Sequence, residues 1–167
     1  RTRLFAAWPT ANPAGVADGE PAPALTVDAA EVSGDSAKAW LDKHGANRCA
    51  VAFSGQWGRG TGELTRVAVV ADDGTAMFCD IDEPVIHSWL QGVSPKVVHD
   101  AKGPMLALRA LGIELGGLTC DTAVAAYVVA PGARGQQLED LADKYLGISL
   151  EVPAEASGQL FDEGPTG

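Results

Sequence analysis

The sequence has no long apolar run and no excess of positive charge, and each absence excludes a class of protein. None of its 167 residues lies in a run of about 18 or more apolar residues, which excludes a transmembrane helix. Acidic residues outnumber basic ones by 22 to 12, so the formal net charge is −10. Such a charge repels phosphate at long range and argues against a stand-alone nucleic-acid binder.

Cysteine is scarce, and the three thiols form no CxxC pair. Cys49, Cys79 and Cys120 stand far apart in apolar surroundings, which is typical of reduced, buried thiols in a cytosolic protein. Their spacing supplies no zinc site. The chain begins with Arg1 and shows no secretory signal pattern, so we expect an internal piece of a longer protein.

Apolar residues are plentiful, at 46% of the chain, and predict one folded domain with an attached arm. The arm is predicted over residues 1–27, where four prolines argue against a long helix. Phe5 or Trp8 is a candidate to pin this arm onto the body. The domain itself is predicted over residues 28–167, with its C-terminal part truncated.

Hydrophobic periodicity predicts a mixed α/β fold. Ser33 or Asp35 can cap a first helix, and an Asp-Gly turn at 72–74 joins two apolar runs as in a hairpin. Strands are predicted at 49–53, 64–70, 75–79, 96–98 and 118–120. Helices are predicted at about 35–44, 83–91, 105–111, 121–130 and 136–146. Three antiparallel strands followed by αβαβ predict a mixed sheet with helices on both faces, an order that fits a ribonuclease H-like sheet.

Four segments in this order resemble the 3′–5′ exonuclease domain of bacterial DNA polymerase I, of family A. They are KVVHDAKGPMLAL from Lys96, LGIELGGL from Leu111, CDTAVAAYVVAP from Cys120 and LEDLADKYLG from Leu138. The resemblance covers about residues 47–150. Each segment alone is weakly diagnostic, but their succession is fairly specific.

The resemblance implies a site of four carboxylates that hold two divalent metal ions, which activate water and stabilise the leaving 3′ oxygen. Here the matching positions carry none. Ser54 and Gln56 stand where the family has Asp and Glu on the first strand, and Pro104 replaces the third ligand, an Asp. The fourth position would fall after Gly167. Neutral ligands do not offset the charge of two close divalent ions, so the resemblance implies a degenerate, inactive form.

Two alternatives use other residues. Asp100 and His99 precede Pro104 and could form a relocated metal site of an active exonuclease, although Asp100 suits a loop and cap and Asp121 suits an N-cap. Trp57 could stack on a base of single-stranded nucleic acid. We instead expect Trp57 to fill the vacated site or to pack under the glycine loop at 58–62.

The resemblance therefore implies a structural, non-catalytic domain of a DNA-directed DNA polymerase that acts in repair and replication. Its implied partners are the adjacent polymerase and 5′ nuclease domains, with little or no direct DNA contact and no membrane. No cofactor is expected in this fragment, whereas Mg²⁺ is expected for the parent polymerase. The implied location is the bacterial cytosol.

Overall fold

A computed structural model describes residue 27 and residues 29–58, 61–132 and 137–150 of the chain. The predicted arm at 1–27, apart from Val27, and the tail beyond residue 150 lie outside the described residues. The chain divides into a unit of Thr26–Leu138 and a second unit formed by its two ends. The helix α5 (Leu138–Leu146) is the described element of the second unit and is considered by itself.

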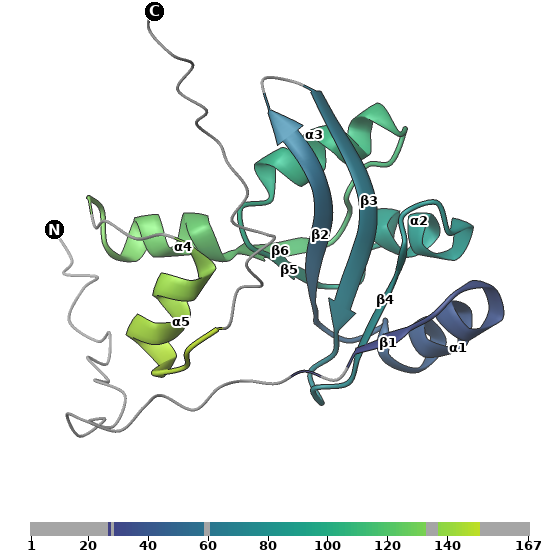
Figure 1. The fold of residues 1–167 in the computed structure, drawn as a ribbon, viewed down its shortest axis with the longest axis horizontal. Helices are drawn as coiled ribbons and strands as arrows, with labels where there is room; N and C mark the ends of the chain where they lie inside the picture. Colours follow the sequence, from purple (N-terminus) through teal and green to yellow (C-terminus); the bar gives the residue numbers. More distant parts are fainter. Residues whose placement is uncertain (1–26, 28, 59–60, 133–136, 151–167) are drawn as a thin grey trace, which may run out of the picture. The chain divides into compact units, whose positions relative to one another are not determined.

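The Thr26–Leu138 unit is built on a six-stranded mixed sheet with the order β1-β4-β3-β2-β5-β6 (Figure 1). Strands β2, β3 and β4 form an antiparallel meander, while β1 pairs parallel with β4, and β5 and β6 extend the sheet in parallel from β2. The strands are β1 (Ala29–Glu31), β2 (Cys49–Gly58), β3 (Thr61–Val70), β4 (Ala76–Asp80), β5 (Lys96–Val98) and β6 (Leu118–Asp121). The predicted α/β class with a mixed sheet is confirmed.

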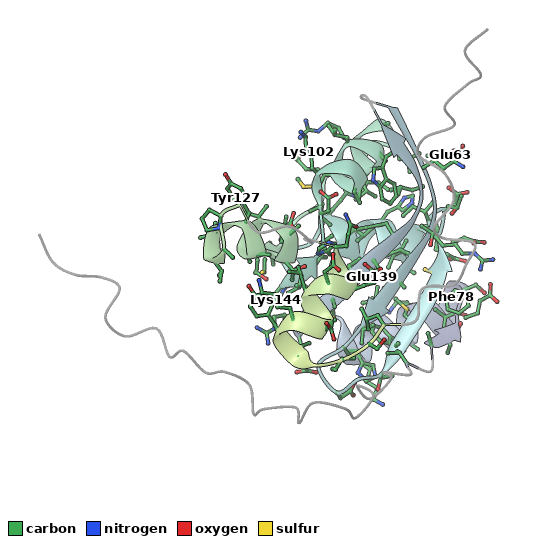
Figure 2. The ribbon with its side chains drawn as sticks, turned by 60° about the vertical axis from the view of Figure 1, so that its left-hand side comes forward. Glu63, Phe78, Lys102, Tyr127, Glu139 and Lys144 are labelled. Carbon is green, nitrogen blue, oxygen red and sulfur yellow. The ribbon has the colours of Figure 1, made fainter. Side chains whose placement is uncertain are left out.

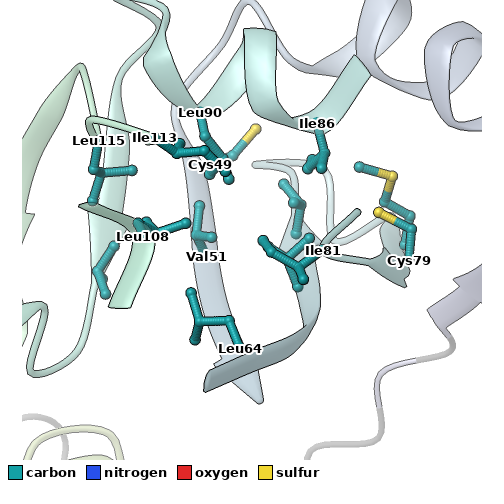
Figure 3. Packing of buried hydrophobic residues seen from close by; sticks show 14 of the residues in the cluster. Cys49, Val51, Leu64, Cys79, Ile81, Ile86, Leu90, Leu108, Ile113 and Leu115 are labelled. Atoms are coloured by element: carbon teal, nitrogen blue, oxygen red, sulfur yellow. The ribbon is translucent and has the colours of Figure 1, made fainter. Parts of the chain in front are cut away.

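Side-chain alternation along the strands places the core on one face of the sheet. Val51, Val69 and Met77 lie opposite one another across three strands and are buried. Helices α1 (Gly34–His44), α2 (Pro84–Gln91) and α3 (Lys102–Ala110) close this face with Leu41, with Ile86 and Leu90, and with Leu108, respectively (Figure 3). Helix α4 (Thr122–Val129) follows β6 and contributes no residue to this cluster.

The opposite face of the sheet carries small and polar side chains on β2. Ala50, Ala52 and Ser54 alternate with the core residues and are exposed in the described part of the chain. The helices that join the core cluster, α1 to α3, therefore share one face of the sheet. None of the helices among the described residues is long and apolar enough to cross a membrane.

The structure corrects several local predictions. Strand β1 had no sequence signal, because three residues of low strand propensity form a strand only by pairing with β4. Glu83 caps α2 instead of Asp80 or Asp82, and Ala101 precedes α3 instead of Asp100. Cys49 and Cys79 are buried as predicted, and burial raises the pKa of Cys79 to about 11. Cys120 is only half-buried.

Candidate functional site at the junction of β2 and α3

The first two candidate positions lie on β2, on the sheet face that points away from the core. Ser54 pairs with Arg66 of β3, and Gln56 pairs with Glu63, on either side of a bulge between Ser54 and Gly55. Both side chains are exposed. The bulge keeps them on the same face although the register shifts, because Gly55 pairs with the buried Leu64. Two neutral side chains therefore stand two residues apart at this end of the strand.

The third candidate position, Pro104, lies in the first turn of α3 and is buried. Proline is tolerated there because the first N–H groups of a helix have no partner within the helix. Its ring offers no oxygen to a metal ion. Pro104 thus serves the start of the helix and cannot serve as a ligand.

Trp57 joins the two elements. A Cβ atom added at Gly103 would overlap the Trp57 indole, so the ring lies directly against the backbone at the start of α3. Gly62 faces Trp57 across the hairpin, and a Cβ there would come 2.7 Å from Cβ of Ala107 on α3. The indole is 39% exposed. Trp57 follows Gln56 and Gly103 precedes Pro104, so the contact lies one residue from two of the three candidate positions.

The residues of the alternative metal site are engaged in a different arrangement. His99 Nδ1 lies 2.9 Å from Oγ1 of Thr122, within hydrogen-bond distance. Asp100 has a φ of +50°, in the left-handed region, and its N–H donates to Oδ1 of Asp121 at 3.0 Å. Asp100 therefore shapes the loop that leads into α3, and Asp121 holds that loop.

Asp121 accepts hydrogen bonds from two segments at once. Its carboxylate caps α4 through the N–H groups of Ala123 and Val124, at 2.9 and 3.4 Å, and also accepts from the N–H of Ala101 at 2.9 Å. Burial raises the pKa of Asp121, but these N–H groups together with that of Asp100 outweigh burial and hold the pKa below its usual range. The prediction of Asp121 as an N-cap is confirmed.

These donors do not match a two-metal centre. Within residues 29–58, 61–132 and 137–150, no three His, Cys, Asp or Glu side chains gather closely enough to hold a metal ion. Glu63, which sequence reasoning missed, is the carboxylate in register with Gln56, and the register of the hairpin is the signal that would have found it. Figure 2 shows Glu63 on the hairpin and Lys102 on α3, both pointing outward.

Comparisons with known proteins agree with this architecture. The fold resembles that of Brucella melitensis NrnC with bound Mg²⁺, with a TM-score of 0.59, 18% identity and coverage of 80% of this chain and 67% of that one. It also resembles Escherichia coli RNase D, an exoribonuclease involved in structured RNA processing, with a TM-score of 0.60, 16% identity and coverage of 74% and 35%. The predicted ribonuclease H-like fold is confirmed.

The sequence comparisons define the family within that fold. Residues 61–152 match the family model of the DNA polymerase I ribonuclease H-like domain, and the chain belongs to this family. DNA polymerase I of Mycobacterium leprae is 39% identical over 74% of this chain and 15% of its own length. The structure of the POL domain of Pol1 from M. smegmatis, in complex with DNA primer-template and dNTP, matches with 39% identity and a TM-score of 0.66 over 73% of this chain and 23% of that one. The chain thus spans about 15% of the length of the curated relatives.

Proposed function

We propose that this domain is a non-catalytic, structural module of a DNA polymerase I. In this proposal the module has lost 3′–5′ exonuclease chemistry and serves as a spacer and docking surface for the polymerase and 5′ nuclease domains of the same polypeptide. The parent chain is a DNA-directed DNA polymerase that acts in repair and replication in the bacterial cytosol. Polymerisation belongs to parts of the polypeptide outside these residues.

The observation that carries the proposal is the chemistry of the three candidate positions. Hydrolysis by two metal ions requires anionic oxygen ligands, because Mg²⁺ and similar hard cations bind carboxylates and their positive charges repel each other at short range. Ser54, Gln56 and Pro104 supply no negative charge. The indole of Trp57 against Gly103 supports the same conclusion, because it occupies the junction of β2 and α3 beside these positions.

The acidic balance of the chain is consistent with this role. A net charge of −10 disfavours close approach to the phosphate backbone, and the proposed module leaves DNA binding to its neighbours. It requires no cofactor of its own, and the Mg²⁺ requirement belongs to the polymerase part of the polypeptide.

Metal binding and nuclease assays test the proposal on the same preparation. Calorimetric titration with Mg²⁺ or Mn²⁺ is expected to show no paired sites of micromolar affinity, and a single-stranded DNA labelled at its 5′ end is expected to keep its full length. The proposal is wrong if paired metal binding appears together with 3′ trimming that Asp100→Ala abolishes. That result would establish the alternative exonuclease with relocated ligands at Asp100 and His99.

A gel-shift assay at low salt tests the base-stacking role of Trp57. We expect no complex with single-stranded DNA at micromolar protein. A complex that Trp57→Ala removes and Trp40→Ala keeps would instead assign nucleic-acid binding to the exposed part of the indole.

A further inference from the structure

Helix α4 has the composition of a buried helix but the exposure of a surface helix. Its sequence from Thr122 to Val129 contains no charged residue, and only Ala126 is buried. The exposed apolar surface of α4 consists of Val124, Tyr127, Val128 and Val129, which are 56–70% exposed. Figure 2 shows the Tyr127 side chain projecting outward from the helix. Helices that are apolar all round normally lie inside a protein, so this surface calls for a covering partner.

A groove between α3 and α4 continues this surface. Its volume is about 370 Å³, and Met105, Leu106, Leu118 and Val124 form much of its apolar lining. Leu106 is 45% exposed although its side chain is large and apolar. Lys102 and Arg109, both exposed, also line the groove and place two positive charges beside it. The combination fits an apolar helix that carries acidic side chains along one edge.

We propose that the exposed apolar surface of α4 and the α3–α4 groove form the docking site for an apolar helix with acidic residues from the polymerase part of the same polypeptide. This inference rests on the proposed function and locates the docking surface within it. The chain belongs to a family whose curated relatives named DNA polymerase I are longer, since it spans about 15% of their length. A large covalently linked neighbour is the partner at the highest effective concentration.

Charge disfavours a second copy of the chain as the occupant. Each copy carries a net charge of −10, so two copies repel each other as they approach. Lys102 and Arg109 attract acidic side chains specifically at the groove, and this local charge differs in sign from that of the chain as a whole.

Hydrogen exchange tests the proposal, with the isolated 167-residue chain compared against the full polymerase polypeptide. The backbone amides of β3, which lie in the core, report whether each sample is folded. At equal protection of β3, the amides of α4 are expected to exchange at least about tenfold more slowly in the full polypeptide. Equal exchange of α4 in the two samples would overturn the proposal, and slower exchange at higher concentration of the isolated chain would assign the surface to a second copy.

Two matched pairs of variants in the full polypeptide locate the surface. Val128→Glu is expected to remove the additional protection of α4, whereas Val93→Glu, at a valine that is 93% exposed elsewhere, is expected to leave it intact. Lys102→Glu combined with Arg109→Glu is expected to reduce the protection several-fold, whereas Lys38→Glu on α1 is not. Unchanged protection in Val128→Glu or in the double variant contradicts the proposed occupant.

This experiment and the test of the proposed function fail separately. A domain that trims 3′ ends but shows protected α4 amides would refute the non-catalytic role and keep the docking surface. A domain without nuclease activity whose α4 exchanges equally in both samples would keep the non-catalytic role and refute the docking surface.

Discussion

The indole of Trp57 lies directly against the backbone of Gly103, where any Cβ would overlap the ring. The contact joins the end of β2 to the start of α3 and depends on residue 103 having no side chain. It accounts for a glycine in the first turn of a helix, where glycine is otherwise unfavourable. Gln56 and Pro104 are sequence neighbours of this contact, so the packing of Trp57 and the missing ligands belong to one region.

We expect Gly103→Ala to destabilise the domain by about 1–3 kcal/mol, because the added methyl group displaces a packed aromatic ring. Chemical denaturation measures the loss, and the fluorescence of Trp57 is expected to shift to longer wavelength as the ring becomes more exposed. A double-mutant cycle with Trp57→Ala provides the control. In that background Gly103→Ala is expected to be neutral or stabilising, and an undiminished loss would contradict the contact.

Restoring the two ligands on β2 is expected to leave the domain inactive. In the variant Ser54→Asp with Gln56→Glu, two carboxylates return to the strand, but Pro104 still supplies no third ligand near the start of α3. A single-stranded substrate labelled at its 5′ end measures the activity, with a proofreading DNA polymerase as the positive control. Robust cleavage by the double variant would show that the third position has been matched wrongly.

Asp121 is expected to stabilise two segments, so its removal should exceed the effect of an ordinary cap. The loss of an N-cap typically destabilises a protein by about 1 kcal/mol, and we expect Asp121→Ala to reach about 2 kcal/mol because the loop N–H groups of Asp100 and Ala101 also lose their acceptor. Asp82→Ala, at an exposed carboxylate, is the matched control. Similar losses in the two variants would contradict the double role.

The pKa of Asp121 predicts a loss of stability in acid. Because its folded-state pKa is lowered, its contribution is fully present above the unfolded value of about 3.9 and is lost as the pH falls through the lower folded value. Denaturation midpoints between about pH 2 and pH 6 should therefore fall less steeply in Asp121→Asn than in the unmodified protein. The lowered pKa of Asp73 contributes the same trend to both proteins. Identical slopes would exclude a role for Asp121.

The fully buried Lys96 predicts a second sensitive position. Its Nζ donates to the carbonyl oxygens of Gly92 and Ser94, at 3.1 and 3.0 Å, and lies 4.5 Å from the ring centroid of Trp89. Lys96→Met keeps the apolar stem but leaves both carbonyls without this donor, and we expect a loss of about 1–3 kcal/mol in the free energy of unfolding. Lys38→Met on α1, where the lysine forms an exposed ion pair with Asp42, is expected to lose less than about 0.5 kcal/mol.

Local patterns were sufficient to predict most of the elements around the site. The alternation in β2 and β3, the Asp-Gly turn and the helical spacing of α2 and α3 are local properties, so the sequence alone indicated them. The hairpin extends farther than predicted, to Gly58 and Thr61, because cross-strand pairing stabilises glycines that have low strand propensity by themselves. Strand β1 was missed for the same reason, since its pairing with β4 is a long-range contact.

The sequence by itself determined the absence of carboxylates at Ser54, Gln56 and Pro104, because the identity of a side chain sets its charge in any fold. Only the tertiary structure decided that Trp57 lies against Gly103, that Asp121 serves two segments and that the apolar helix α4 is exposed. These features join residues far apart in the chain or depend on what covers a surface. Burial and hydrogen-bond partners are properties of the packed whole, and local periodicity carries no information about them.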